Sequence, residues 1–282
     1  MSTPRIDLLL HVDACSQAFF HKKDNPAYSG ASLRGADLQN MNLIGANLAQ
    51  FDLEGANLEG ANLEGAILFE ANLTRVNLRG ANLQGADLRN VNLKEADLSG
   101  ARLRRADLSK AQANFAVFSE AQLDNAKLIE ASLVCAAFNK ACLDKALAFK
   151  ANFEGANFEG ASIEFAHLDG ANFSGAKFKE VSFLESNLER VSFKGLAIEK
   201  ANMSGAFLGG ADFSGSTLTK VNLREAILRD ALFGNSTLFS SDLSFCDASG
   251  ADFAGASILH STLLGLDFSK AKSQPQNLTQ AD

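Results

Sequence analysis

The sequence predicts an all-β solenoid in which the chain turns a corner every five residues. A repeat of that length runs from Ala31 to Lys270 without an insertion or a deletion. Its middle residue is Leu, Phe, Ile or Met in 45 of the 48 units, and the residue two positions earlier is Ala in 33 of them. A period of five suits neither a helix nor a strand. Only a chain that bends once per unit therefore keeps both residues inward.

The spacing of the phenylalanines predicts four units per coil. Ten of the twelve phenylalanines at the middle position fall into two series with a spacing of 20 residues. One series is Phe153, Phe173, Phe193, Phe213, Phe233 and Phe253, and the other is Phe118, Phe138, Phe158 and Phe178. Rings that stack on one another in successive coils produce such series. The 240 residues of the repeat therefore predict a four-sided solenoid of about 12 coils.

The remaining positions of the unit suit corners and a backbone ladder. Gly often occupies the fifth position, where a corner needs positive φ. Asn and Asp interchange at the second position, which favours a hydrogen-bonding role for their side chains at the corner. All three prolines lie outside the repeat, as a ladder of backbone hydrogen bonds requires.

The best units read Ala-Asn-Leu-Glu-Gly, as at 56–60 and 61–65, and they resemble the pentapeptide-repeat family. The resemblance covers residues 31–270. It implies a right-handed quadrilateral β-helix, a handedness that the spacing alone does not give. The functions of this family are diverse, so the resemblance predicts the fold and leaves the role open.

We expect three segments, which are an N-terminal capping helix with a linker at 1–25, the pentapeptide-repeat β-helix at 26–270 and a polar C-terminal tail at 271–282. Thr3 and Pro4 are typical of a helix start, and apolar residues follow them at helical spacing. A solenoid exposes its core at each end unless something covers it. The predicted helix therefore covers the first coil.

Large apolar residues near the other end have no obvious cover, which predicts a homodimer formed through the C-terminal coils. Its predicted interface comprises Phe239, Phe245, Leu259, Leu264 and Phe268. Burial of apolar surface stabilises by about 25 cal/mol per Å² before the costs of association. The resemblance agrees, because several members of the family pair in this way. The alternative is a monomer whose tail folds back over the end.

A second set of outward apolar residues shares one side of the predicted coils and indicates a partner-binding face. The set is Ile67, Phe69, Ile129, Leu147, Phe149, Phe207 and Ile227. The alternative is local repacking, since Leu147 and Phe149 flank the small Ala148 and one of them could turn inward.

The sequence contains no recognisable catalytic, cofactor or metal motif, so we expect neither an enzyme nor a bound cofactor. The four histidines are scattered, and the four cysteines lack the spacing of metal ligands. A net charge of −7 argues against direct binding of nucleic acid. No apolar run reaches membrane-spanning length, and the N-terminus lacks the pattern of a signal peptide, so we expect a cytoplasmic, bacterial protein.

These features predict a non-catalytic scaffold or regulator that presents a β-helical surface to a protein partner. The alternative is a DNA mimic that binds DNA gyrase or another topoisomerase, an activity that the family resemblance implies for some members. The net charge suits mimicry, but acidic residues do not form a continuous column. Along one column, Glu59 is followed by Arg79, and Glu159 is followed by Lys179.

Overall fold

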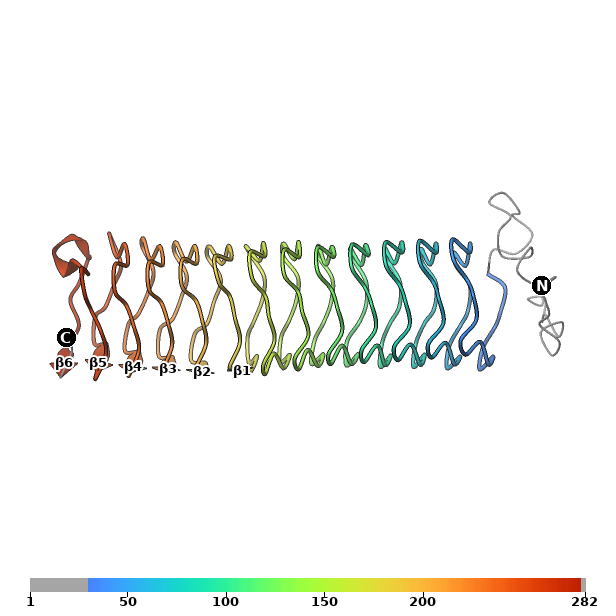
Figure 1. Ribbon diagram of the computed structural model, residues 1–282. Helices are drawn as coiled ribbons and strands as arrows, with labels where there is room; N and C mark the ends of the chain where they lie inside the picture. Colours follow the sequence, from blue (N-terminus) through green and yellow to red (C-terminus); the bar gives the residue numbers. More distant parts are fainter. Residues whose placement is uncertain (1–29, 280–282) are drawn as a thin grey trace. The chain divides into compact units, whose positions relative to one another are not determined.

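The computed structural model describes residues 30–279 (Figure 1). These residues form two units, 30–142 and 143–279. Each unit is a parallel β-solenoid, so the predicted fold class is confirmed. The described residues contain no α-helix. The N-terminal helix expected within 1–25 lies outside the described residues. The count of about 12 coils runs through both units, and it stays a prediction.

In the unit of residues 30–142, parallel bridges join residues that are 20 positions apart. They begin with Ser32 and Asp52 and continue to Gln122 and Cys142. Backbone hydrogen bonds to the coils before and after each repeat hold this register. For example, Leu58 N donates to Asn77 O at 2.7 Å, and Asn57 N donates to Ala36 O at 2.9 Å. The prediction of four corners per coil is therefore confirmed within this unit.

The unit of residues 143–279 continues the same pattern and contains the named strands. They are β1 (Phe178–Lys179), β2 (Ala197–Glu199), β3 (Thr217–Thr219), β4 (Thr237–Phe239), β5 (Ser257–Leu259) and β6 (Asn277–Thr279). These strands form one parallel sheet in sequence order, and each residue pairs with the residue 20 positions later. A short 3-10 helix, η3 (Phe268–Lys270), precedes β6.

The interior holds the small and large residues that the repeat places inward, almost all of them fully buried. The predicted stack of rings is confirmed. The ring centroids of Phe193 and Phe213 are 4.9 Å apart with 9° between the planes, and those of Phe213 and Phe233 are 4.9 Å apart with 6°. In the other unit, Phe118 and Phe138 stack at 4.9 Å. Each ring thus fills the space directly above the ring of the previous coil.

The corners have positive φ whichever residue occupies them. Gly60 has a φ of 64°, and Phe115 has a φ of 63°. The predicted role of Asn and Asp is confirmed, because Asn57 Oδ1 accepts a hydrogen bond from Glu59 N at 3.2 Å. Asn77 Nδ2 also donates to Asn57 Oδ1 at 3.1 Å, which ties one coil to the next. These bonds hold the corner and tie it to its neighbour in the next coil.

Residues 271–279, predicted as part of a polar tail, extend the ladder. The register slips by one residue where Phe253 N donates to Ser273 O at 3.4 Å, and it recovers where His260 N donates to Thr279 O at 2.9 Å. Leu278 therefore lies over Ile258, in line with an inward column. This added segment buries Ile258 completely, while Leu278 itself remains 51% exposed.

We predict that Phe213→Ala lowers the free energy of unfolding by about 3–5 kcal/mol, because it removes a ring that touches two others and leaves a cavity. Urea-induced unfolding followed by circular dichroism measures the change. The matched control is Phe115→Ala, which removes a ring that is 53% exposed and should cost less than about 1 kcal/mol. Equal losses for the two variants would contradict the stacked core.

Candidate interaction surfaces

The described histidines lie on the exterior beside aromatic rings. The His167 ring is 5.6 Å from that of Phe149, and the His260 ring is 5.3 Å from that of Phe239. Both pairs bridge adjacent coils, since His167 is one coil beyond Leu147 and His260 is one coil beyond Ser240. These contacts account for the two imidazoles as packing partners of outward phenylalanines.

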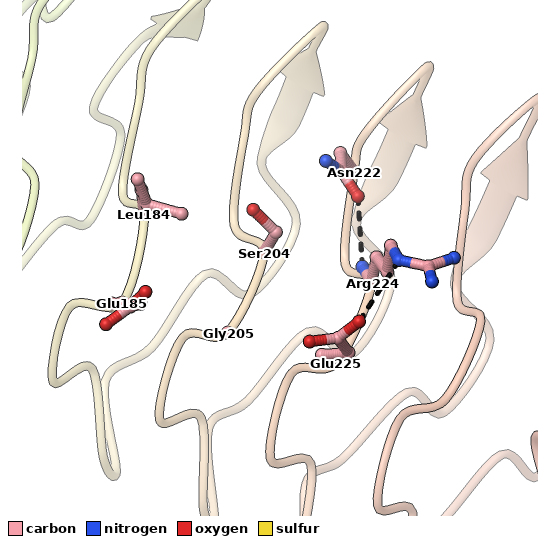
Figure 2. A pocket seen from close by; sticks show the side chains of 7 residues that line it. All are labelled: Leu184, Glu185, Ser204, Gly205, Asn222, Arg224 and Glu225. Atoms are coloured by element: carbon pink, nitrogen blue, oxygen red, sulfur yellow. Dashed lines mark hydrogen bonds and ion pairs between the residues drawn. The ribbon is translucent and has the colours of Figure 1, made fainter.

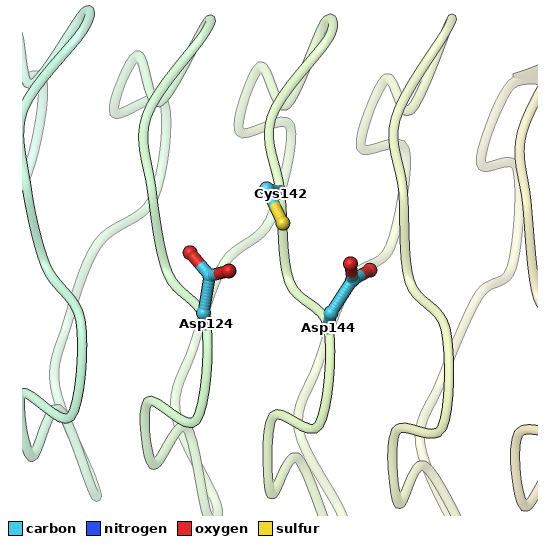
Figure 3. Close-up of side chains that lie close together, drawn as sticks. All are labelled: Asp124, Cys142 and Asp144. Carbon is cyan, nitrogen blue, oxygen red and sulfur yellow. The ribbon is translucent and has the colours of Figure 1, made fainter.

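Figure 3 shows three neighbouring side chains of types that can bind a metal ion, those of Asp124, Cys142 and Asp144. Each of the two carboxylates accepts a hydrogen bond from a residue of the larger unit to which it belongs, 30–142 or 143–279. Arg104 Nε donates to Asp124 Oδ2 at 3.3 Å. Ser162 Oγ donates to Asp144 Oδ1 at 2.6 Å, and Glu164 N donates to the same atom at 3.0 Å. We therefore interpret both carboxylates as ties between successive coils.

Cys246 is a buried thiol within the stack. Its Sγ donates to the carbonyl oxygen of Leu223 at 2.9 Å. Burial raises the pKa of the Cys246 thiol to about 12. The thiolate is the reactive form of cysteine, so this side chain is chemically inert near neutral pH. Cys135, by contrast, is exposed at a corner.

Charged residues on the exterior pair across neighbouring coils. Arg229 Nε lies 2.6 Å from Asp247 Oδ2, and Lys200 Nζ lies 2.9 Å from Glu180 Oε1. Hydrogen bonds from Ser249 and then from Arg229 lower the pKa of the Asp247 carboxyl to about 2. Such pairs place cations among the carboxylates, so the exterior carries charges of mixed sign.

Four of the five residues of the predicted dimer interface form two pairs, and Phe268 lies apart from them; together we call the five the C-terminal apolar surface. Phe239 is 40% exposed and pairs in register with the half-buried Leu259 in β4 and β5. Phe245 and Leu264 are 45% and 60% exposed, and Phe245 N donates to Leu264 O at 2.7 Å. Phe268 is half-buried and packs edge-on against Phe253 at 5.3 Å.

The end of the ladder adds Leu278 to this exposed apolar area. The segment that carries it is tied to the preceding coil by Asp252, which accepts a hydrogen bond from Ser273 Oγ and pairs with Lys272 Nζ at 3.1 Å. Hydrogen bonds from Ser273, Ala254 and Lys272 lower the pKa of the Asp252 carboxyl to about 2. The segment covers Ile258, which is fully buried, while Leu278 is 51% exposed.

The first three residues of the predicted partner face do not form one apolar patch in their unit. Ile67, Phe69 and Ile129 are all half-buried. The guanidinium of Arg89 lies over the Phe69 ring, 5.5 Å from its centroid, and also pairs with Asp87 at 2.6 Å. These charged groups separate Phe69 from Ile129.

The other four residues of that face lie in the unit of residues 143–279 and form two groups. Leu147 and Phe149 stay half-buried on the outside, while Ala148 is fully buried, so neither large side chain turns inward. Phe207 is 44% exposed and pairs in register with the half-buried Ile227. Phe207 is thus the most open residue of the predicted face.

Two shallow hollows lie near Phe207. One, of about 370 Å³, is lined by Phe165, Ala166, His167, Glu185, Asn187, Glu189 and Phe207. The other, of about 270 Å³, is lined by Leu184, Glu185, Ser204, Gly205, Asn222, Arg224 and Glu225 (Figure 2). Glu185 lines both. Sequence reasoning missed this glutamate. The consecutive glycines Gly209 and Gly210 indicate a corner with little side-chain volume, but they do not point to Glu185.

Comparison with known families gives one match that spans most of the chain. The family model described as "Pentapeptide repeats (8 copies)" matches residues 31–68, 71–110, 106–144, 156–195, 198–235 and 238–272. No curated protein matches this chain in sequence.

Solved structures of pentapeptide repeat proteins are similar to the chain. HetL of Nostoc sp. strain PCC 7120, involved in regulation of heterocyst differentiation, shares 30% identity, with a TM-score of 0.43, over 79% of this chain and 89% of its own. A thylakoid-lumen protein of Arabidopsis thaliana shares 28% over 36% and 74%, with a TM-score of 0.30. QnrB1, a plasmid-mediated fluoroquinolone resistance protein, shares 21% over 75% and 87%, with a TM-score of 0.29.

The described residues contain no helix with the length and apolar character that a membrane crossing requires.

Proposed function

We propose, from the premise that this chain belongs to the pentapeptide-repeat family, that it is a non-catalytic scaffold or regulator that binds a protein partner through its β-helical surface. In this proposal the protein is cytoplasmic, and a helix within 1–25 caps a solenoid of about 12 coils. The exterior around Phe207 and Ile227 is the partner face. The single observation that carries the proposal is Phe207, a large apolar side chain that is 44% exposed.

Burial explains why a phenylalanine at this position favours binding. A fully covered phenylalanine gains about 1.5–3 kcal/mol relative to an exposed one. The core gains nothing from Phe207, because the inward positions of its unit are already filled by Ala206 and Leu208, both fully buried. A partner that covers Phe207 and the adjacent Ile227 therefore uses apolar surface that folding leaves open.

The C-terminal apolar surface supports a second part of the proposal, namely a homodimer through the C-terminal coils. Phe239, Phe245, Leu264 and Leu278 are each at least 40% exposed. They lie on consecutive coils at the end of the ladder, and they stay exposed although His260 packs against Phe239 and Arg224 lies over Phe245. A second copy offers the same apolar residues in return, as an interface with twofold symmetry requires.

A DNA mimic that binds gyrase is the alternative function, and the net charge of −7 favours it. The ion pairs between coils weaken this alternative, because they place cations such as Lys200 and Arg229 among the carboxylates. A supercoiling assay with purified gyrase separates the two functions. A scaffold neither inhibits the enzyme nor protects it from quinolones at micromolar concentration, whereas a gyrase-directed mimic does.

We predict that a photo-crosslinking residue at the partner face captures a defined protein. With p-benzoylphenylalanine in place of Ile227, irradiation of cells that naturally make this chain should give one discrete adduct. The control places the same residue at Glu154, which is exposed on a different side of the coil. Adducts of equal yield and pattern at both positions, or none at Ile227, would rule out this partner face.

We also predict that Phe239→Glu combined with Leu264→Glu gives a monomer, because the two added carboxylates would lose their hydration in the interface. Light scattering measures the mass, and circular dichroism should stay that of a β protein. A matched control is Glu154→Lys, which leaves the C-terminal apolar surface intact. If the unsubstituted protein is already a monomer, the dimer is wrong.

A further inference from the structure

The coil that carries Phe207 lacks side chains at the corners next to this residue. Gly205, Gly209 and Gly210 occupy the corner positions on either side of it, so no neighbouring side chain of that coil shields the ring. Among the described residues, no other aromatic ring and no cation contacts the Phe207 ring. The ring face is therefore open to a ligand.

Two glutamates of the preceding coil lean over these glycines. A Cβ added at Gly205 would lie 3.0 Å from Glu185 Cγ, and one added at Gly209 would lie 3.7 Å from Glu189 Oε1. The missing side chains thus leave room for both glutamates beside Phe207. We call the group formed by Glu185, Glu189 and Phe207 the acidic notch.

The carboxylates of the notch differ from most of their neighbours. Glu180, in the same coil, pairs with Lys200, and Glu225 pairs with Arg224 at 3.2 Å (Figure 2). Within residues 30–279, neither Glu185 nor Glu189 has an ion pair or a hydrogen bond to its carboxylate. Arg190 lies at the adjoining corner, where its Cγ is 3.5 Å from a Cβ added at Gly210. The two glutamates and Arg190 together therefore carry a net charge of −1.

At two other places, an arginine lies over a phenylalanine ring and also pairs with an acidic side chain. Arg224 lies over the Phe245 ring at 4.6 Å while it pairs with Glu225. In the other unit, Arg89 lies over Phe69 at 5.5 Å while it pairs with Asp87. The acidic notch has the ring and two carboxylates, and its hollow of about 370 Å³ has room for a side chain. What it lacks is the arginine.

We propose that the acidic notch binds the guanidinium group of an arginine in the partner protein. The planar guanidinium stacks on the Phe207 ring, and its N–H groups donate to the carboxylates of Glu185 and Glu189. This inference rests on the proposed function, because it names the chemistry by which the partner face recognises its ligand. Arginine fits better than lysine, whose compact ammonium cannot stack on the ring while it donates to two separate carboxylates.

The test uses the full chain labelled with ¹⁵N and the acetylated, amidated peptide Gly-Gly-Arg-Gly-Gly. The control peptide carries citrulline, which keeps the shape of arginine without the charge. In a titration followed by NMR, the arginine peptide should shift the amide signals of residues 185–189 and 205–209, and the citrulline peptide should leave them in place. Shifts spread evenly over acidic surfaces, or equal shifts with citrulline, would overturn the proposal.

Two variants of the notch and a matched control complete the experiment. Phe207→Leu keeps the apolar volume and removes the ring, while Glu185→Gln with Glu189→Gln removes both charges. Each should weaken binding of the arginine peptide by about fivefold or more, the equivalent of about 1 kcal/mol. Glu154→Gln with Glu159→Gln makes the same change in net charge on other sides of the coil, and it should change binding less than twofold. A control as damaging as the notch variants would show only general electrostatic attraction.

This experiment separates the notch from the proposed function. If crosslinking at Ile227 captures a partner but the arginine peptide does not bind at the notch, the scaffold stands and guanidinium recognition is wrong. If the peptide binds at the notch while no partner is captured, guanidinium recognition stands and the scaffold proposal fails. Spectra of the variants must match that of the parent away from the notch, which confirms that they fold.

Discussion

The register of 20 residues between hydrogen-bonded segments is the constraint on which the rest of the structure depends. Each coil donates to and accepts from its neighbours through the backbone, as in the bond from Leu58 N to Asn77 O. Parallel pairing at a constant offset places like residues over like residues, so a phenylalanine selected in one coil favours a phenylalanine in the next. The nearly parallel rings of Phe213, Phe233 and Phe253 follow from that offset.

Backbone hydrogen bonds hold a solenoid together, so most of its outward side chains are not required for the fold. Residues such as Phe207 and Glu185 do not contribute to the core, and their identities can therefore serve recognition. Where these outward groups do have partners, the partners lie one coil away, as with Lys200 and Glu180. Among residues 30–279, the carboxylates of Glu185 and Glu189 have no such partner, and this distinguishes the acidic notch from the paired exterior.

The core, the corners and the ladder could be predicted from the sequence, because the residues that form them recur in every five-residue repeat. The pairing of Phe239 with Leu259 also followed from their separation of 20 residues. The open space beside Phe207 did not, because it depends on how far Glu185 and Glu189 lean over glycines of the next coil. The strand around Leu278 was equally hard to predict, because the hydrogen-bond register shifts by one residue at Ser273, shortly before this strand.

Deletion of a whole coil tests the register most directly. Removal of residues 211–230 joins Gly210 to Ala231 in phase, so Phe233 should stack on Phe193 and the urea midpoint should fall only slightly. Removal of residues 211–228 is shorter, but it shifts the five-residue phase by two. The large middle residues of every later unit, such as Phe233, then move to the corner, and Arg229 takes an inward position, which should cost more than about 3 kcal/mol or prevent folding. Equal stability of the two deletion variants, measured by urea-induced unfolding, would contradict the account.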